Sequence, residues 1–467
     1  MSEASRANEA DRANEAGRAS EMSRASEVEL GVVDALTHEG EGVVHAGKTV
    51  FVAGALPGEV VRFRRVRRRK RHDEGALLEV VRPAAERAVP RCAHFGVCGG
   101  CALQHLAPER QIEAKQAELR DSLERIARAT PERWLEPLRG PEWGYRRRAR
   151  LGVRFVPKKG RVLVGFRERL SPYVTATDRC EVLAAPVGDL IAPLSSLLTT
   201  LEMGRRVPQI EVAVGDHATA LVLRVLEPAP TAQELERLQA FERQHAVRLY
   251  LQSGGLDSVT RLDAAAGFMG AGTGEQPLDY TLRDCGIRIE FLPTDFIQIN
   301  APVNEALVAR AVALLEPTPG SRVLDLYCGL GNFTLPLARR AGRVVGVEGE
   351  RRLVERARHN ARLNAVENAD FIETDLASPE CASAWGPGAF SHVLLDPPRT
   401  GARDVMRTIA RIGPQRLLYI SCHPGSLARD VGILAHEHGF RLRAAGVVDM
   451  FPHTTHVESL ALLTPGG

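Results

Sequence analysis

The sequence has no long apolar run and few cysteines, and both absences restrict what the protein can be. Nowhere does it approach the roughly 20 consecutive apolar residues that a membrane-spanning helix needs, and its N-terminus has no apolar signal-peptide core. We therefore expect a cytoplasmic protein with no membrane partner. The chain has 8 cysteines in 467 residues, and in a large cytoplasmic protein cysteines are more often metal ligands or catalytic groups than disulfide partners.

The remaining composition is that of a folded protein with two or three domains. Hydrophobic residues make up 44% of the chain, which is enough for real cores, and the formal net charge is only +3. Residues 1–27 are an exception, because the motifs RANEA and RASE repeat there with a period of six that fits neither a helix nor a strand. We expect these residues to form a disordered tail.

Residues 28–84 contain short runs of β-forming residues separated by glycines. The runs are Val28–Val33, Thr49–Val52, Glu59–Val66 and Leu77–Val81. This spacing predicts a small β-barrel. The segment from Arg62 to Arg71 contains eight Arg or Lys residues. A solvated strand edge protected by charge would look similar, but such a density favours binding to a nucleic-acid backbone.

Three cysteines, Cys92, Cys98 and Cys101, follow within ten residues around a Gly-Gly turn. Cys180 is the only nearby candidate for a fourth ligand. Thiolate-rich sites suit zinc or an iron–sulfur cluster, and the spacing does not choose between them. We place these cysteines in a central domain, residues 85–284, which also contains a predicted amphipathic helix at Gln111–Ile126 and a second basic cluster at Tyr145–Arg150.

Residues 285–467 alternate strands and helices, as an α/β domain does. The stretch Val323–Ala338 combines a short apolar strand, a glycine turn and a helix start with an N-cap near Asn332–Thr334. A second strand ends in Glu348, whose carboxylate suits the hydroxyls of a ribose. The turn lacks the third glycine of a dinucleotide-binding motif and has no Lys or Ser/Thr for phosphates, so we interpret it as an S-adenosylmethionine site.

Further polar motifs follow the predicted strands His392–Leu395 and Leu417–Ile420, at the ends where open α/β sheets bind ligands. Asp396-Pro397-Pro398 also occurs in methyltransferases that act on exocyclic amines, but those sites usually continue with an aromatic residue. Cys422 favours different chemistry, because carbon 5 of a pyrimidine becomes nucleophilic only after a thiolate adds to carbon 6. A base, for which Glu458 is the candidate, must then remove the proton from carbon 5.

With these motifs the chain resembles the RNA uracil-5-methyltransferase family over roughly residues 28–467. The motifs CGGC, FIQIN, DLYCGLGNFTL, DPPR, SCHP and HVES occur in the family's order. The resemblance implies an RNA-binding TRAM barrel, a [4Fe–4S] cluster and a C-terminal Rossmann-like methyltransferase domain dependent on S-adenosylmethionine. This chain has both the predicted barrel and the cysteines. In the family, the transfer-RNA branch lacks the cysteines and a shorter 23S branch lacks the barrel. The combination therefore favours the longer branch that modifies 23S ribosomal RNA.

The resemblance also implies roles for individual residues. The cluster would be bound by Cys92, Cys98, Cys101 and Cys180. The S-adenosylmethionine site would be lined by Gln298, Tyr327, Asn332, Glu348, Asp375 and Asp396. Cys422 would be the nucleophile and Glu458 the base, and the flipped uracil would be surrounded by Phe296, Arg399 and His453. Two positions depart from the family pattern, since His423 stands where Asn is common and Asp375 where some relatives have Asn.

Three alternatives remain at this point. The first is an enzyme that acts on another ribosomal or transfer-RNA uridine. A radical methylthiotransferase also joins a TRAM domain to an iron–sulfur cluster, but it needs a C-x3-C-x2-C triad that this chain lacks. A non-catalytic assembly factor would use the barrel and the basic clusters alone, and it would leave the strand-end residues unexplained. We expect a monomer that acts on ribosomal RNA and does not bind DNA.

Overall fold

The computed structural model describes residues 28–262, 277–376, 378 and 385–466. The chain divides into two compact units. Unit 1 comprises Met1–Gly96, Cys101–Ala114 and His453–Thr455, and unit 2 comprises Val97–Gly100, Lys115–Pro452 and His456–Gly467. The predicted disordered tail, residues 1–27, lies outside the described residues, so it stays a prediction.

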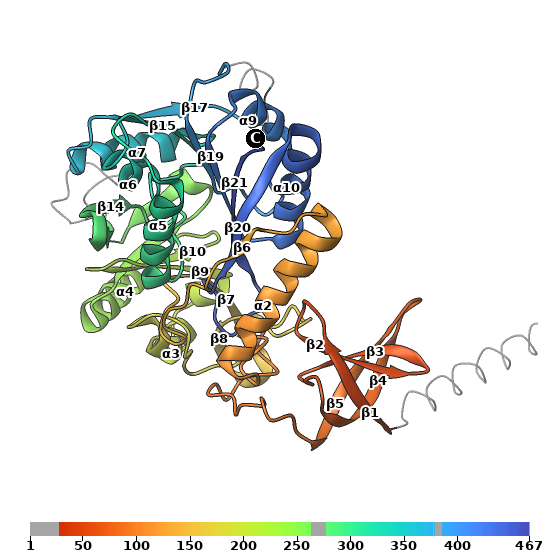
Figure 1. The fold of residues 1–467 in the computed structure, drawn as a ribbon. Coiled ribbons are helices and arrows are strands. Elements are labelled where there is room, and N and C mark those ends of the chain that lie inside the picture. The colour runs from red at the N-terminus through yellow and green to blue at the C-terminus, as the bar shows by residue number, and fades with distance from the viewer. Residues whose placement is uncertain (1–27, 263–276, 377, 379–384, 467) are drawn as a thin grey trace, which may run out of the picture. The chain divides into compact units, whose positions relative to one another are not determined.

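Unit 1 contains a closed five-stranded β-barrel in the order β1-β2-β3-β5-β4, drawn in red and orange in Figure 1. Its strands are β1 (Val28–Leu36), β2 (Glu41–Ala46), β3 (Lys48–Ala53), β4 (Val60–Arg68) and β5 (Asp73–Arg82). Inward-facing residues form its core: Val33, Val44, Val50, Val52, Ala55, Val61 and Phe63. The predicted barrel is therefore confirmed. Strand β2 was not predicted, because Gly42 interrupts its β-forming residues; a Cβ there would lie only 2.8 Å from Val33 Cγ1.

Unit 2 contains a six-stranded sheet in the order β12-β11-β10-β9-β7-β8. Its strands are β7 (Arg148–Val156), β8 (Arg161–Gly165), β9 (Gln209–Val214), β10 (Thr219–Arg224), β11 (Arg248–Gln252) and β12 (Val259–Arg261). A two-stranded sheet follows, formed by β13 (Leu278–Leu282) and β14 (Ile287–Phe291). The larger sheet buries a continuous apolar core that includes Leu151, Leu194 and Ile210, so this region has its own hydrophobic interior.

The second large sheet of unit 2 has eight strands in the order β17-β16-β15-β18-β19-β21-β20-β6. They are β6 (Arg133–Trp134), β15 (Arg322–Leu326), β16 (Arg343–Glu348), β17 (Ala369–Glu373), β18 (His392–Leu395), β19 (Arg416–Ser421), β20 (Phe440–Val448) and β21 (Glu458–Pro465). Strands β15 to β19 are parallel, whereas β21 is antiparallel to both β19 and β20. This order confirms the predicted Rossmann-like α/β fold.

Helices cover this sheet, and Figure 1 shows α5 and α10 on opposite sides of its strands. The α-helices of all described parts of the chain are α2 (Pro108–Ser122), α3 (Ile191–Thr199), α4 (Ala232–His245), α5 (Ala301–Leu315), α6 (Thr334–Ala338), α7 (Arg351–Leu363), α9 (Met406–Ile412) and α10 (Pro424–His438). Short 3₁₀ turns are η2 (Pro157–Lys159), η3 (Val187–Asp189), η4 (Met203–Arg206), η5 (Leu256–Ser258), η6 (Arg283–Cys285) and η7 (Arg403–Val405). In the part of the chain that the structure describes, no helix has the length and apolarity to cross a membrane.

The predicted helix Gln111–Ile126 is observed as α2 followed by a π-helical turn, η1 (Leu123–Ala127). The wider turn changes the helical periodicity. Ile126, which was predicted on the buried face, is therefore 52% exposed, whereas Leu123 is fully buried.

Candidate active site

The carboxyl ends of the five parallel strands meet at one edge of the eight-stranded sheet. Five predicted residues lie at or just past these ends: Tyr327, Glu348, Asp375, Asp396 and Cys422. Glu458 is the first residue of the antiparallel strand β21, and the neighbouring Ser459 pairs with Ser421 at the end of β19. Strand order therefore brings the predicted nucleophile and base to the same edge, although they are far apart in the chain.

Cys422 lies in the turn between β19 and α10, where its thiol is partly exposed. The next residue, His423, is the N-cap of α10, and its Nδ1 accepts a hydrogen bond from the backbone N–H of Ser426 at 3.0 Å. An asparagine side chain caps helices in the same way. The departure from the family pattern at His423 therefore keeps the helix cap next to the nucleophile.

The acidic groups at this edge strongly influence one another. Burial, together with the charge of Asp396, raises the pKa of Glu458 well above its usual range. Burial also raises the pKa of Asp396 to about 7. The pKa of Cys422 rises to about 11 because of burial and the charges of Glu458 and Asp396, and Arg399 partly offsets this rise. Because β18, β19 and β21 are neighbours in the sheet, the three acids lie at adjacent strand ends and form one site.

Strand β15, which leads into the glycine turn, carries another buried carboxyl group. Asp325 is 1% exposed, and its Oδ2 accepts a hydrogen bond from the Thr334 hydroxyl at 2.5 Å. Among the described residues, Asp325 Oδ1 has no hydrogen-bond partner. Burial raises the pKa of Asp325 to about 7, and the charges of Asp396 and Glu348 add to this rise. A buried acceptor without a partner marks a position where a ligand's donor group fits.

Glu348 is held in one orientation by backbone amides. Its Oε2 accepts from the N–H of Gly329 at 3.1 Å, and its Oε1 accepts from Gly349 and Glu350 at 2.8 and 3.0 Å. Tyr327, which precedes the turn, adopts a φ of 64°, a left-handed conformation that is uncommon for a residue with a side chain. The turn is thus fixed against the carboxylate that is predicted to bind a ribose.

Asn332 belongs to a polar network that the sequence did not reveal. Its Oδ1 accepts from the Tyr280 hydroxyl at 2.9 Å and from Asn304 Nδ2 at 2.9 Å, and its own Nδ2 donates to Asn304 Oδ1 at 3.0 Å. Tyr280 comes from β13 and Asn304 from α5. Of the other residues predicted for the cofactor site, Gln298 is partly buried and Asp375 is exposed. Phe296, which was predicted to lie near the uracil, is also exposed.

The loop after Asp396, which carries Arg399, is anchored to α10. The buried Asp430 accepts hydrogen bonds at Oδ2 from the Ala402 N–H at 2.8 Å and from the Tyr419 hydroxyl at 2.7 Å. Arg429 donates to the carbonyl of Thr400 at 2.9 Å. Asp430 therefore connects the Asp396 loop with strand β19, three residues before Cys422, and the sequence had no motif that pointed to it.

The segment before Glu458 is also anchored. Lys115 is 3% exposed and donates to Asp449 Oδ1 at 2.7 Å and to the Phe451 carbonyl at 2.9 Å. The Tyr145 hydroxyl donates to the carbonyl of Pro452 at 2.9 Å. The predicted uracil contact His453 belongs to unit 1, where its backbone N–H donates to Gln111 Oε1 at 2.9 Å.

The predicted metal ligands are thiols, and none of them forms a disulfide. Cys92 and Cys101 belong to unit 1, and Cys98 and Cys180 belong to unit 2. The Sγ of Cys98 accepts a hydrogen bond from the Gly100 N–H at 3.4 Å. Within the described ranges, no three His, Cys, Asp or Glu side chains form a group that could hold a metal ion. The iron–sulfur cluster therefore stays a prediction.

A doubly wound sheet with acidic side chains at its strand ends is the architecture of Rossmann-like methyltransferases. The family model described as tRNA (Uracil-5-)-methyltransferase matches residues 278–465. The chain is 51% identical over 431 residues to the 23S rRNA (uracil(1939)-C(5))-methyltransferase RlmD of Alkalilimnicola ehrlichii, covering 92% of this chain and 95% of that one. It is 50% identical to the RlmD of Nitrosococcus oceani, with coverages of 92% and 94%. The chain belongs to the RNA uracil-5-methyltransferase family.

The fold has a solved relative as well. The crystal structure of the Pyrococcus abyssi tRNA (uracil-54, C5)-methyltransferase in complex with S-adenosyl-L-homocysteine superposes with a TM-score of 0.73. The two chains are 24% identical, and the match covers 93% of this chain and 99% of the other. Membership in an enzyme family explains the strand-end residues that the assembly-factor alternative leaves unexplained.

Proposed function

We propose that the protein transfers a methyl group from S-adenosylmethionine to carbon 5 of a uridine in 23S ribosomal RNA, at the position named for its relatives, uracil 1939. The observation that carries the proposal is the convergence of Cys422, Asp396 and Glu458 on one sheet edge, where their charges influence one another. Addition of a thiol to a pyrimidine and removal of a proton need such a pair of groups.

The glycine turn fits S-adenosylmethionine, which supplies the methyl group when bound. The partnerless Oδ1 of Asp325 suits the ligand's ammonium group, because a buried acceptor gains most from a charged donor. Glu348 would bind the ribose hydroxyls, and Asp375 the adenine amino group. Gln298, Tyr327, Asn332 and Asp396 would complete the site. Asp325 is an addition to the residues proposed from sequence.

In the proposed reaction, the partly exposed thiol of Cys422 releases its proton to solvent water and the thiolate sulfur bonds to carbon 6 of the uracil, which moves the C5=C6 electron pair to carbon 5 as an enolate. Carbon 5 accepts the methyl group. Glu458 then takes the proton from carbon 5, the double bond re-forms, and the carbon–sulfur bond breaks. The raised pKa of Glu458 makes its carboxylate, once ionised, a stronger proton acceptor than that of an ordinary glutamate.

The remaining assignments are also proposals. Residues 28–84 would form a TRAM-like RNA-binding barrel, residues 85–284 a central domain and residues 285–467 the methyltransferase domain. Cys92, Cys98, Cys101 and Cys180 would bind a [4Fe–4S] cluster. The donor chemistry supports this, since four thiols and a backbone N–H directed at the Cys98 sulfur suit a cluster.

The proposed roles of Cys422 and Glu458 predict opposite behaviour of their variants. Glu458→Gln should accumulate a covalent RNA adduct in the presence of S-adenosylmethionine, because addition and methyl transfer proceed but elimination stalls. Cys422→Ala should form neither adduct nor product and should still bind RNA. The double variant should behave as Cys422→Ala does. Denaturing electrophoresis of labelled RNA detects the adduct.

Glu437→Gln, an exposed substitution on α10, is the matched control and should turn over normally. An adduct formed by Cys422→Ala, or full turnover by that variant, would overturn the assignment. A uniform loss of activity without any trapped species would instead point to a structural role for both residues.

A further inference from the structure

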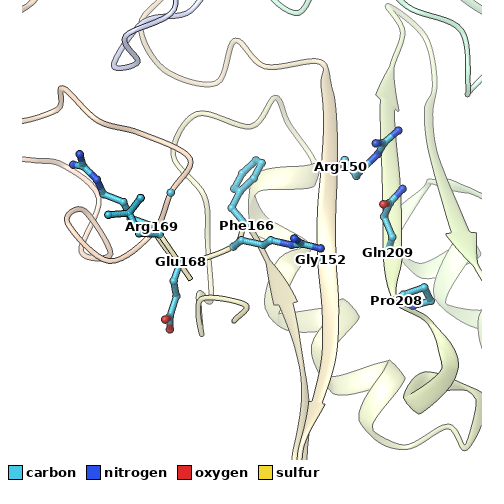
Figure 2. Close-up of a pocket in the computed structure, with 10 residues that line it drawn as sticks. Arg150, Gly152, Phe166, Glu168, Arg169, Pro208 and Gln209 are labelled. Atoms are coloured by element: carbon cyan, nitrogen blue, oxygen red, sulfur yellow. The ribbon is translucent and has the colours of Figure 1, made fainter. Parts of the chain in front are cut away.

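Unit 2 has a pocket of about 630 Å³ on its six-stranded sheet, outside the sheet edge described above (Figure 2). Its walls come from β7, from the segment after β8 and from the start of β9. The lining side chains that matter here are Arg150, Phe166, Arg167, Glu168, Arg169 and Gln209. The pocket is open to solvent and too polar for an apolar ligand, but its volume suffices for a nucleotide.

The pocket carries an excess of positive charge. Arg150 shares Glu211 with Arg148, each at 3.1 Å, and the Arg150 side chain remains 69% exposed. Arg167 is exposed and forms no ion pair among the described residues. Figure 2 shows Glu168, the one acidic residue of the lining, on the opposite side of the pocket from Arg150. Guanidinium groups in this arrangement favour a phosphate.

The cysteine segment builds one wall of the pocket. The Gly99 N–H donates to the Arg167 carbonyl at 2.8 Å, and the Arg169 N–H donates to the Val97 carbonyl at 2.8 Å. Cys98 and Glu168 form the antiparallel bridge between these bonds. A Cβ at position 99 would lie 3.0 Å from the Arg167 carbonyl oxygen, so glycine permits this close pairing. The pairing fixes the backbone that carries Arg167 and Arg169.

Arg146 connects this pocket with the segment that carries the predicted site residue Gln298. The Arg146 guanidinium lies 5.4 Å from the centre of the Phe166 ring, and the backbone of Arg146 bridges to Asn300, two residues after Gln298. Arg146 therefore contacts the pocket through Phe166, and its backbone pairs with the segment that carries Gln298.

We propose that this pocket binds a flanking nucleotide of the substrate RNA, with its phosphate on Arg150 and Arg167, while the target uridine lies at Cys422. This inference rests on the proposed function, because it takes RNA as the substrate. It adds a subsite on the central sheet and gives the segment Val97–Gly99 a role in shaping it. A single-stranded nucleotide fits the pocket, since a duplex cannot enter a cavity of this size.

The test compares two double variants with equal charge loss. Arg150→Ala/Arg167→Ala empties the pocket of two cations, whereas Lys158→Ala/Lys159→Ala removes two exposed lysines in η2, which do not line it. Fluorescence anisotropy without S-adenosylmethionine measures affinity for an RNA fragment that carries the target uridine and flanking sequence on both sides. We expect the pocket variant to bind at least ten-fold more weakly, with a salt slope reduced by about 0.7 per lost contact. The lysine variant should change affinity less than three-fold.

Shortening the RNA locates the subsite. When the flank that reaches the pocket is removed, wild type and the pocket variant should bind equally, whereas removal of the other flank should preserve their difference. Equal losses in both double variants, or a difference that survives both truncations, would overturn the subsite. Because affinity is measured without methyl transfer, wild-type protein that binds RNA but never methylates it would count against the proposed function alone.

Discussion

Cys422 shares its sheet edge with Glu458 and Asp396, and negative charge near a thiol opposes its ionisation. Burial has the largest effect on its pKa, followed by these two carboxylates, and Arg399 acts in the opposite direction. At neutral pH the thiol therefore keeps its proton. In the proposed reaction, this proton must therefore leave before or during the attack of the sulfur on carbon 6.

This environment predicts the pH dependence of Cys422 alkylation. Without RNA, the rate of reaction with iodoacetamide should rise with pH up to about 11, since only the thiolate reacts. Glu458→Gln removes a negative charge and should shift the profile to lower pH, and Arg399→Ala should shift it to higher pH. Mass spectrometry of the Cys422 peptide gives the rates. Coincident profiles for wild type and Glu458→Gln would contradict the proposed proximity of the two groups.

The positions of Cys422, Asp396 and Glu458 at strand ends were predictable from sequence, whereas their proposed roles stay predictions. Residues that act through tertiary contacts were not. Tyr280 and Asn304 hold Asn332, yet one lies in a strand and the other in a helix, and neither belongs to one of the motifs. Their roles depend on how β13 and α5 meet the glycine turn, and local sequence patterns do not contain that information.

Among the elements, strand β4 and the segment directly after it contain two kinds of basic residue. Arg65 is largely buried and pairs with Glu29 and Asp73, each at 2.7 Å. Although burial alone would raise the pKa of Asp73, hydrogen bonds from Lys48 and Arg65 lower it to about 2. Within the described ranges, no ion pair is formed by Arg64, Arg68, Lys70 or Arg71. Arg65 therefore contributes to the stability of the barrel through buried ion pairs, whereas these four cations form none among the described residues.

We expect variants of the two kinds to separate RNA binding from stability. Replacing Arg68, Lys70 and Arg71 with Ala should weaken RNA affinity and reduce its salt slope by about 2, at about 0.7 per contact, with little change in thermal unfolding. Arg65→Ala should destabilise the barrel by about 1–3 kcal/mol, because Asp73 loses a buried partner. Arg62→Ala is the control for both variants, because Arg62 forms an exposed ion pair with Glu79 and its loss should change stability little. An unchanged salt slope in the triple variant would assign these cations to a solvated surface.

Elements were more predictable than their ends. The strand His392–Leu395 was predicted with its observed bounds, since a buried parallel strand is a continuous apolar run. The N-cap expected near Asn332–Thr334 was wrong: α6 has no side-chain cap, and the Thr334 hydroxyl bonds Asp325 instead. A hydroxyl near a helix start has several possible hydrogen-bond partners. Here it donates to the buried carboxylate of Asp325 and does not cap the helix.

At the scale of the whole molecule, the cysteines raise the question of a cluster. Three of them lie within ten residues, whereas Cys180 follows much later in the chain. A zinc ion and an iron–sulfur cluster both accept four thiolates, but only the cluster contains sulfide and absorbs visible light. Composition analysis of the intact protein therefore distinguishes them.

Protein purified without oxygen should be brown and should contain about four iron and four sulfide ions per chain. Cys180→Ser should lose most of both, because a cluster with three protein ligands is less stable. Cys285→Ser is the matched control and should keep them, since Cys285 donates to the Leu282 carbonyl in a different part of unit 2. Stoichiometric zinc without sulfide would rule out the cluster.

The position of Asp430 affects how inactive variants of this protein should be interpreted in a genetic screen. Its carboxylate joins the loop of Asp396 and Arg399 to the strand that leads to Cys422, and its loss would leave the Tyr419 hydroxyl and the Ala402 N–H buried without an acceptor. Substitutions there would therefore be recovered alongside those of the reacting groups. A screen that ranks positions by lost activity would count Asp430 among the catalytic residues. Its role is instead to hold the Asp396 loop and strand β19 in place through Ala402 and Tyr419.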